Sequence, residues 1–321
     1  MLKFVIMPPQ NDLKKWFATR LTETLSDYTV VSPETDEDAR REMVDADAAF
    51  GWIPPEALSV AEKLRWLQNP DSGPFEGYFY PELIDHPVII ANPRGIYFDH
   101  ISHHIMMFVL ALSRGLPWYV EAQSRKVWDK EARKSPYIYL PDATALIVGV
   151  GGVGHETARL CHELGMDVIG VDPRPEYDLP HVEMHAPEEL NDVLPRADFV
   201  IATTPHTPET AGMWNTDRFK RMKNTAYFIN IGRGKTTRID ALADAVESGE
   251  IGGCGLDVYE IEPLPPNHKL WTLPNVLLTP HIAVREADNL PERRFHILLE
   301  NARRFAAGQP LKNIVDKNRW Y

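Results

Sequence analysis

The chain has 321 residues, enough for two domains of ordinary size, with 44% hydrophobic and 25% charged residues, as in a globular protein. Its formal net charge of -12 argues against nucleic acid or an anionic membrane surface as the main partner. The two cysteines, Cys161 and Cys254, imply no disulfide framework, and the N-terminal apolar run is too short for a signal peptide, so the expected compartment is the cytoplasm.

The first third of the chain alternates short apolar runs with helix-like segments. The predicted strands lie at residues 2–7, 48–51, 64–68 and 88–91. An amphipathic helix at 12–25 follows the first of them, and this alternation predicts a small parallel sheet covered by helices. A strongly apolar helix is predicted at 99–116, and the polar segment 130–142 is predicted to be an exposed connection.

A second βα series occupies the middle of the chain. Its strands are predicted at 145–150, 167–171, 199–203, 226–231, 255–258 and 276–278. Most are continuous apolar runs, as expected for parallel strands that are covered on both faces. A helix at 293–307, which ends before Gly308 and Pro310, closes the chain. The sequence therefore predicts an α/β protein with two doubly wound parallel-sheet domains.

A glycine-rich segment at 149–154 matches G-x-G-x-x-G between a predicted strand and a predicted helix. In that context the glycines permit a tight turn, close approach of a pyrophosphate and close packing of the helix. Asp172 ends the next strand and is expected to accept hydrogen bonds from ribose hydroxyls, which favours NAD over NADP. Arg174 could instead pair with a 2′-phosphate. The predicted cofactor residues here are Gly149, Gly151, Gly152, Val153, Gly154, Asp172 and Arg174.

Three polar side chains, Arg233, Glu262 and His281, follow three consecutive predicted strands. Since the carboxyl ends of parallel strands share one edge of a sheet, we expect these side chains to lie close together. Arginine can bind a carboxylate and polarise a carbonyl, and histidine can donate a proton. Glu262 is the candidate that orients His281, with Glu260 as a competitor. Alone, each motif is more often a cap or a turn; together they predict hydride transfer between NAD(H) and a small 2-oxo acid.

With these motifs the chain resembles the D-isomer-specific 2-hydroxyacid dehydrogenase family. The matching segments are 149–154, Asp172, 204–210, 230–234, 256–264, 279–283 and 300–311. The resemblance implies that Arg233, Glu262 and His281 are the catalytic residues. It also implies that the cofactor is lined by Thr204, Pro205, Thr210, Ile231, Gly232, Arg233, Asp257 and His281.

The family resemblance also implies a domain arrangement and a substrate loop. A Rossmann NAD domain at 99–284 is inserted in a flavodoxin-like substrate domain formed by 1–98 and 285–321, and the helix at 99–116 suggests a homodimer contact. The substrate residues implied are Ser72, Gly73, Tyr97 and Arg233. Asp71 stands where the family usually has a small residue, so either it points away from the substrate carboxylate or the substrate differs.

Several features leave alternatives open. His100, His103 and His104 are spaced to share one helical face, so a metal site is conceivable, but a histidine-rich helix start at a contact is favoured and no metal is predicted. On the same scaffold, a dehydrogenase of formate or phosphite is the enzyme alternative. An NAD-sensing corepressor is the non-catalytic alternative. The sequence leaves open which 2-oxo acid is used.

Overall fold

The computed structural model of the chain describes residues 1–72, 77–132, 134, 136–174, 179–284 and 289–318. The chain forms two compact units, Met1–Ile96 with Ala287–Tyr321, and Tyr97–Glu286. The second unit is therefore inserted in the sequence of the first. The domain boundaries predicted from the sequence, 98/99 and 284/285, each lie two residues from the boundaries between these units.

The first unit contains a five-stranded parallel sheet with the strand order β2-β1-β3-β4-β5. This is the order of flavodoxin-like folds. The strands are β1 (Leu2–Ile6), β2 (Tyr28–Val31), β3 (Ala48–Phe50), β4 (Trp66–Gln68) and β5 (Ile89–Ala91). The helices are α1 (Asp12–Thr24), α2 (Asp36–Met43), α3 (Pro55–Leu58), α4 (Pro81–Asp85) and α11 (Leu290–Ala306).

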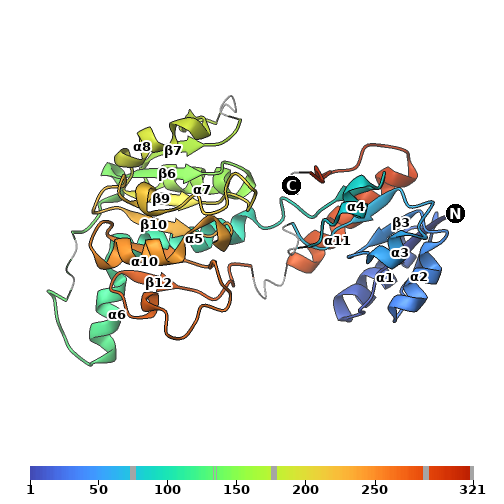
Figure 1. The fold of residues 1–321 in the computed structure, drawn as a ribbon, viewed down its shortest axis with the longest axis horizontal. Helices are drawn as coiled ribbons and strands as arrows, with labels where there is room; N and C mark the ends of the chain where they lie inside the picture. The colour runs from blue at the N-terminus through green and yellow to red at the C-terminus, as the bar shows by residue number, and fades with distance from the viewer. Residues whose placement is uncertain (73–76, 133, 135, 175–178, 285–288, 319–321) are drawn as a thin grey trace. The chain divides into compact units, whose positions relative to one another are not determined.

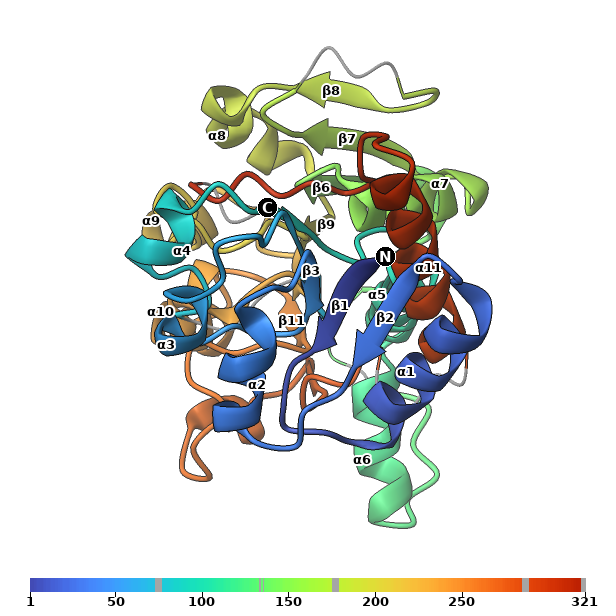
Figure 2. The ribbon, with the colours of Figure 1, turned by 90° about the vertical axis from the view of Figure 1, so that its right-hand side faces the viewer.

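Helices cover both faces of this sheet. Successive side chains of a strand point to opposite faces, so each strand packs against helices on both sides. Phe4 and Ile6 of β1 pack with side chains of α1 and α11, whereas Val5 packs with side chains of α2, α3 and α4. Figure 2 shows α1 and α11 on one side of β1 and β2, and α2 and α3 on the other side. Helix α11, which follows the second unit in the sequence, therefore completes the core of the N-terminal unit.

The second unit contains a seven-stranded sheet, all parallel, with the order β12-β11-β10-β9-β6-β7-β8 (Figure 1). The strand order reverses between β6 and β9, and ligands of doubly wound sheets bind at such a switch point, beyond the carboxyl ends of the strands. The strands are β6 (Thr144–Val148), β7 (Asp167–Val171), β8 (Glu183–His185), β9 (Phe199–Ala202), β10 (Tyr227–Asn230), β11 (Gly253–Leu256) and β12 (Val276–Leu278). The helices are α5 (Phe98–Ser113), α6 (Leu116–Ser124), α7 (Gly152–Glu163), α8 (Leu190–Val193), α9 (Thr216–Phe219) and α10 (Ile239–Glu247).

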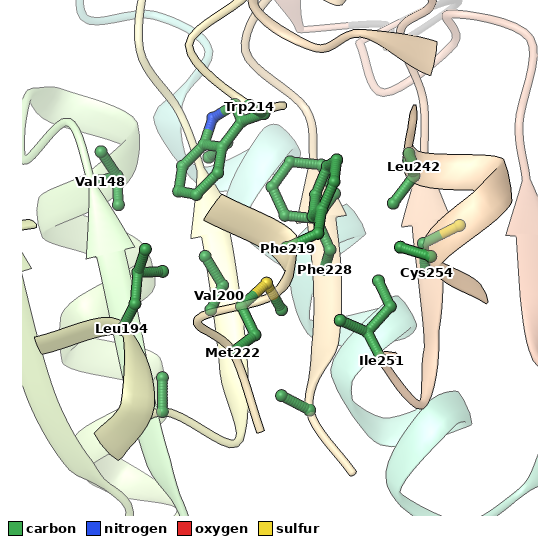
Figure 3. Packing of buried hydrophobic residues seen from close by; sticks show 14 of the residues in the cluster. Val148, Leu194, Val200, Trp214, Phe219, Met222, Phe228, Leu242, Ile251 and Cys254 are labelled. Carbon is green, nitrogen blue, oxygen red and sulfur yellow. The ribbon is translucent and has the colours of Figure 1, made fainter. Parts of the chain in front are cut away.

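Two hydrophobic clusters lie on the two faces of the larger sheet. Ala145 and Ile147 of β6 pack with α5 and α7, and Leu146 and Val148 of the same strand pack with α8, α9 and α10. Figure 3 shows the cluster that contains Val148, in which Trp214 lies beside strands β9 and β10. Burial on both faces explains why most strands of this unit are apolar runs, and it holds their carboxyl ends at one edge.

The predicted helix at 99–116 corresponds to α5, and a second helix that was not predicted, α6, begins at Leu116. Gly115 has φ of +67°, which ends the first helix, α5, and Pro117 lies in the first turn of the second, α6. One face of α5, including Ile105 and Phe108, is buried on the sheet. Across the described residues, no helix combines the length and the apolar character that a membrane span requires.

Candidate active site

The connection from β6 to α7 is built from glycines. Gly149 has φ of +96°, a conformation that favours glycine. Gly154 lies in the first turns of α7, where a Cβ would come within 2.1 Å of the Gly149 carbonyl oxygen. A Cβ at Gly151 would meet no atom within 4 Å, so this side of the loop is open. Gly152 and the half-buried Val153 begin the helix, whose N–H groups point out of this turn.

Asp172 follows β7 and is buried against the glycine loop. Its carboxylate accepts hydrogen bonds from the Val150 N–H at 2.9 Å and from the Arg174 N–H at 3.1 Å. The Arg174 guanidinium also donates to it, from Nε at 3.1 Å. Asp172 therefore holds the shape of the glycine loop in addition to placing a negative charge at the end of β7. The exposed Arg174 places a cation next to that charge.

The segment after β9 lies against the same loop. The backbone nitrogen of Thr204 is 3.0 Å from the position that a Cβ on Gly149 would take. The Thr204 hydroxyl is buried and has no hydrogen-bond partner among the described residues. Thr210 fixes this segment, because its hydroxyl donates to the Pro205 carbonyl at 2.7 Å. An open glycine loop beside an unused buried hydroxyl fits a bound dinucleotide, which these residues would hold by hydrogen bonds.

Arg233 lies in a loop that Asn230, the last residue of β10, holds in place. The Asn230 side chain accepts from the Gly232 N–H at 3.0 Å and donates to the Arg233 carbonyl at 3.2 Å. Gly232 lies so close to Thr204 that a Cβ on Gly232 would be 2.6 Å from the carbonyl oxygen of Thr204. Ile231 is buried, whereas the Arg233 side chain is exposed, with Nη1 donating to the Gly232 carbonyl at 2.7 Å. The guanidinium is thus presented at the edge of the sheet.

His281 and Glu262 form a hydrogen-bonded pair beyond the ends of β12 and β11. His281 Nδ1 lies 2.8 Å from Glu262 Oε2. The other carboxylate oxygen, Oε1, accepts from the Tyr259 N–H at 2.9 Å, so the glutamate is itself oriented. An ionised carboxylate only accepts hydrogen bonds, so Nδ1 carries a proton and Nε2 is the nitrogen that can exchange one. This arrangement suits His281 for proton transfer.

Asp257 holds the segment that contains His281. Its carboxylate is buried and accepts from the Thr279 hydroxyl at 2.6 Å, from the Ile282 N–H at 2.9 Å and from the Ala283 N–H at 3.1 Å. His281 lies between these anchors with φ of +55°, an uncommon conformation for a residue with a side chain. The hydrogen bonds to Asp257 therefore keep the backbone of His281 in a conformation that would otherwise be unfavourable.

Glu260 lies two residues before Glu262 but bonds elsewhere. It accepts from Arg238 Nη1 at 2.8 Å and from the Ile239 N–H at 3.0 Å, at the start of α10. Between the two carboxylates that could have oriented His281, the geometry therefore selects Glu262, and Glu260 stabilises a helix N-terminus.

We expect Glu262→Gln to lower kcat by about tenfold, the value of one charge-assisted hydrogen bond of ~1.5 kcal/mol. Steady-state rates with a 2-oxo acid and reduced cofactor would measure this loss. The matched control is Glu260→Gln, which should change kcat less than about twofold because Glu260 does not contact His281. Equal losses in the two variants would contradict the assignment of Glu262.

The three histidines of α5 are not brought together with each other in the structure. Among the residues that the structure describes, no group of three histidine, cysteine or carboxylate side chains is placed to hold a metal ion. His100 and His103 lie at the start of the helix, whereas His104 Nε2 lies 2.9 Å from the Thr279 hydroxyl. Burial lowers the pKa of His104, and the nearby Asp257 charge acts in the opposite direction. His104 is thus part of the hydrogen-bond network at the end of β12.

The predicted substrate residues are divided between the two units. Ser72 is in the first unit, with a buried hydroxyl that has no partner among the described residues. Next to it, Asp71 forms an ion pair with Arg294 of α11 at 3.0 Å, so a cation offsets its charge. Tyr97 immediately precedes α5 in the second unit. Gly73 lies outside the described residues.

Four supporting side chains were not singled out by the argument from strand ends. Asn230, Thr279, His104 and Tyr259, the last through its hydroxyl bond to the Thr279 carbonyl at 2.9 Å, hold the loops that contain Arg233, Glu262 and His281. Asn230 carried a signal in the sequence, because a polar residue directly after the apolar run 227–229 must find hydrogen bonds when it is buried. The other three are visible only once the chain is folded.

A family model, the NAD-binding domain of D-isomer specific 2-hydroxyacid dehydrogenases, matches residues 106–283, more than half of the chain. The chain belongs to this D-isomer specific 2-hydroxyacid dehydrogenase family. The matched residues all lie in the second unit, which is the Rossmann NAD-binding domain of this family member. The family comprises oxidoreductases that act on the CH–OH group of 2-hydroxy acids.

Relatives match both units of this family member. It is 30% identical over 263 residues to a glyoxylate reductase of Thermofilum pendens, a match that covers 78% of this chain and 76% of the relative. A family member from Xanthobacter autotrophicus, solved with NADPH and MES, has a TM-score of 0.84 at 27% identity and covers 99% of each chain. An NADPH-dependent glyoxylate/hydroxypyruvate reductase from Sinorhizobium meliloti, solved with NADP and sulfate, has a TM-score of 0.82 at 25% identity, with 100% of both chains covered.

Proposed function

We propose that this protein reduces a small 2-oxo acid to the D-2-hydroxy acid with a nicotinamide cofactor, reversibly. The observation that carries the proposal is the 2.8 Å hydrogen bond between His281 and Glu262, on loops at the sheet edge where Arg233 is also presented. The glycine loop at the switch point of the same sheet supports it, as does membership of a dehydrogenase family.

Each residue has a distinct role in the proposed reaction. The bound nicotinamide supplies or accepts the hydride. The Arg233 guanidinium binds the substrate carboxylate and draws electron density from the carbonyl, which a planar cation with several N–H donors does well. His281 donates the proton from Nε2 as the alkoxide forms, and takes it back in the oxidation. Glu262 holds the ring through Nδ1 and stabilises the imidazolium, as its 2.8 Å hydrogen bond permits.

A substrate panel tests the proposal. The purified protein would be assayed with NADH and NADPH against glyoxylate, hydroxypyruvate, pyruvate and branched 2-oxo acids, and with NAD⁺ against formate and phosphite. The proposal expects turnover of at least one 2-oxo acid. Oxidation of formate or phosphite alone would assign the protein to a different dehydrogenase activity. Cofactor binding without turnover of any compound would favour a corepressor-like role.

We further propose NAD as the preferred cofactor, because the buried carboxylate of Asp172 would repel a 2′-phosphate. The neighbouring Arg174 and the NADP(H) in two related structures make NADP the alternative. We expect kcat/KM with NADH to exceed that with NADPH by about tenfold, equivalent to ~1.4 kcal/mol. Arg174→Ala should lower kcat/KM for NADPH more than for NADH. A preference for NADPH in the unmodified protein would contradict the role given to Asp172.

We also propose that the protein is a homodimer. Exposed apolar side chains follow one another along α5, α6 and the next segment: Met107, Leu110, Leu116, Val120, Val127 and Trp128. Trp128 is 91% exposed, which is unusual for so large an apolar side chain and fits a contact with a second copy. We expect Trp128→Arg to shift the mass measured by light scattering from dimer to monomer. The matched variant is Trp271→Arg, at a tryptophan that is 53% exposed and follows Leu270, which packs on the sheet face opposite α5; this variant should remain dimeric.

A further inference from the structure

A chain of hydrogen bonds joins α5 to the segment that contains His281. The Thr279 hydroxyl has a single proton, and the Asp257 carboxylate 2.6 Å away can only accept. Thr279 therefore donates to Asp257 and must accept from His104, whose Nε2 lies 2.9 Å from the same hydroxyl. This assigns the Nε2–H tautomer to His104. The direct distance from His104 Nε2 to Asp257 Oδ1 is 3.8 Å, too long for a hydrogen bond.

Packing fixes the position of His104. Its side chain is 14% exposed, and its ring meets the Phe108 ring edge-on, with centroids 5.1 Å apart and planes at 84°. Phe108, one helical turn further along α5, lies against Gly255 of β11, where a Cβ would come within 2.7 Å of the Phe108 ring. The absence of a side chain at Gly255 lets α5 approach the strand that leads to Asp257. The donor N–H of His104 is therefore held rigidly against the end of the sheet.

We propose that His104 is a positioning residue for His281, acting through Thr279 and Asp257; this rests on the function proposed above for His281. The N–H of His104 orients the Thr279 hydroxyl, and that hydroxyl orients the Asp257 carboxylate. Asp257 in turn holds the N–H groups of Ile282 and Ala283, which directly follow His281. Without the His104 donor, the Thr279 hydroxyl can rotate away and the anchor of the His281 backbone loosens.

The first test is amide hydrogen exchange of the full chain, which needs no substrate. In His104→Leu the amides of Ile282 and Ala283 should exchange about tenfold faster than in the unmodified protein, because local opening becomes easier. Amides of α7, such as Ala158, should stay within about twofold. His104→Gln places an N–H donor at a similar reach and should restore slow exchange. His103→Leu, one residue earlier on the exposed side of α5, is the matched control.

The second test is kinetic and uses the 2-oxo acid with the best turnover. His104→Leu should lower kcat by about tenfold and leave the KM for the 2-oxo acid within about twofold, because the loop of Arg233 is held by Asn230 and not by this chain of hydrogen bonds. His104→Gln should recover most of kcat. Thr279→Val should reproduce the loss and add little to His104→Leu in the double variant, since both act on one chain of hydrogen bonds. Thr279→Ser, which keeps the hydroxyl, should remain near the unmodified rate.

Two results would overturn the proposal. One is unchanged exchange at Ile282 and Ala283 in both His104→Leu and Thr279→Val. The other is faster exchange spread evenly over α5, β11 and the His281 segment, which is the signature of lost packing. If His104→Leu does not fold, the pair Thr279→Val and Thr279→Ser decides the question alone. If no 2-oxo acid is turned over, the proposed function fails, and the exchange data still decide whether His104 holds the His281 segment.

Discussion

Replacing His281 with asparagine should lower kcat for 2-oxo acid reduction by about 10²–10⁴-fold, the usual contribution of a positioned general acid. Asparagine is the informative replacement because it tolerates the left-handed backbone that His281 adopts at φ of +55°. It therefore removes the proton donor without disturbing the hydrogen bonds of Asp257 to the following residues. Stopped-flow measurements of the hydride step would separate this loss from product release.

A second histidine with the same backbone conformation is available as a control. His181 has φ of +67°, is exposed and stacks on His162. The two histidines lie near Thr144 and Asp167, which begin β6 and β7, and so at the edge of the sheet opposite the carboxyl ends of the strands. His181→Asn should leave kcat unchanged. In the proposed reaction, reduction takes the proton of His281 and oxidation returns it, so His281→Asn should slow both directions. Full activity of His281→Asn in both directions would contradict the mechanism.

The interior of both sheets could be predicted from the sequence, whereas two edge strands could not. Strands such as β10 are fully buried, and so they appear as continuous apolar runs. The missed strands, β2 and β8, lie at the edges of their sheets. An edge strand is covered less completely: β8 consists of Glu183, Met184 and His185, none of them fully buried. Three residues with this composition cannot be distinguished from a loop.

The same contrast applies to the candidate site. The placement of Arg233, Glu262 and His281 at one edge of the sheet could be predicted because each lies within six residues of the end of a strand, and parallel strands end at one edge. The hydrogen bonds that support these residues could be predicted only in part. His104 and Thr279, for example, form one of these bonds although they are 175 residues apart in the sequence. Which helix lies against which strand end depends on packing, for example on the contact of Phe108 with Gly255. The ion pair of Asp71 could not be predicted either, because its partner Arg294 lies on α11, more than 200 residues later in the sequence.

Replacing Arg233 with alanine should lower kcat/KM by about 10²–10⁴-fold. Two charge-assisted hydrogen bonds to a substrate carboxylate are worth ~1.5–3 kcal/mol each, and ~1.4 kcal/mol corresponds to tenfold. Asn230 and the close contact of Gly232 with Thr204 hold the loop from the backbone, so truncating the exposed side chain should not unfold it. Kinetics with a homologous series of 2-oxo acids would measure the loss, which should fall on KM as well as on kcat because the carboxylate is bound in the ground state.

Arg233→Lys separates the charge of this residue from its geometry. Lysine keeps the positive charge but loses the planar pair of N–H donors, so we expect an intermediate loss of about 10–10²-fold. The control is Arg238→Lys, which keeps an exposed cation beside Glu260 and should change kcat/KM less than about twofold. If Arg233→Lys retained full activity, the positive charge alone would be enough to bind the substrate carboxylate, and the planar arrangement of N–H donors would not be needed. If Arg233→Ala did so, the substrate carboxylate must be bound by other groups, and the role proposed for Arg233 would be wrong.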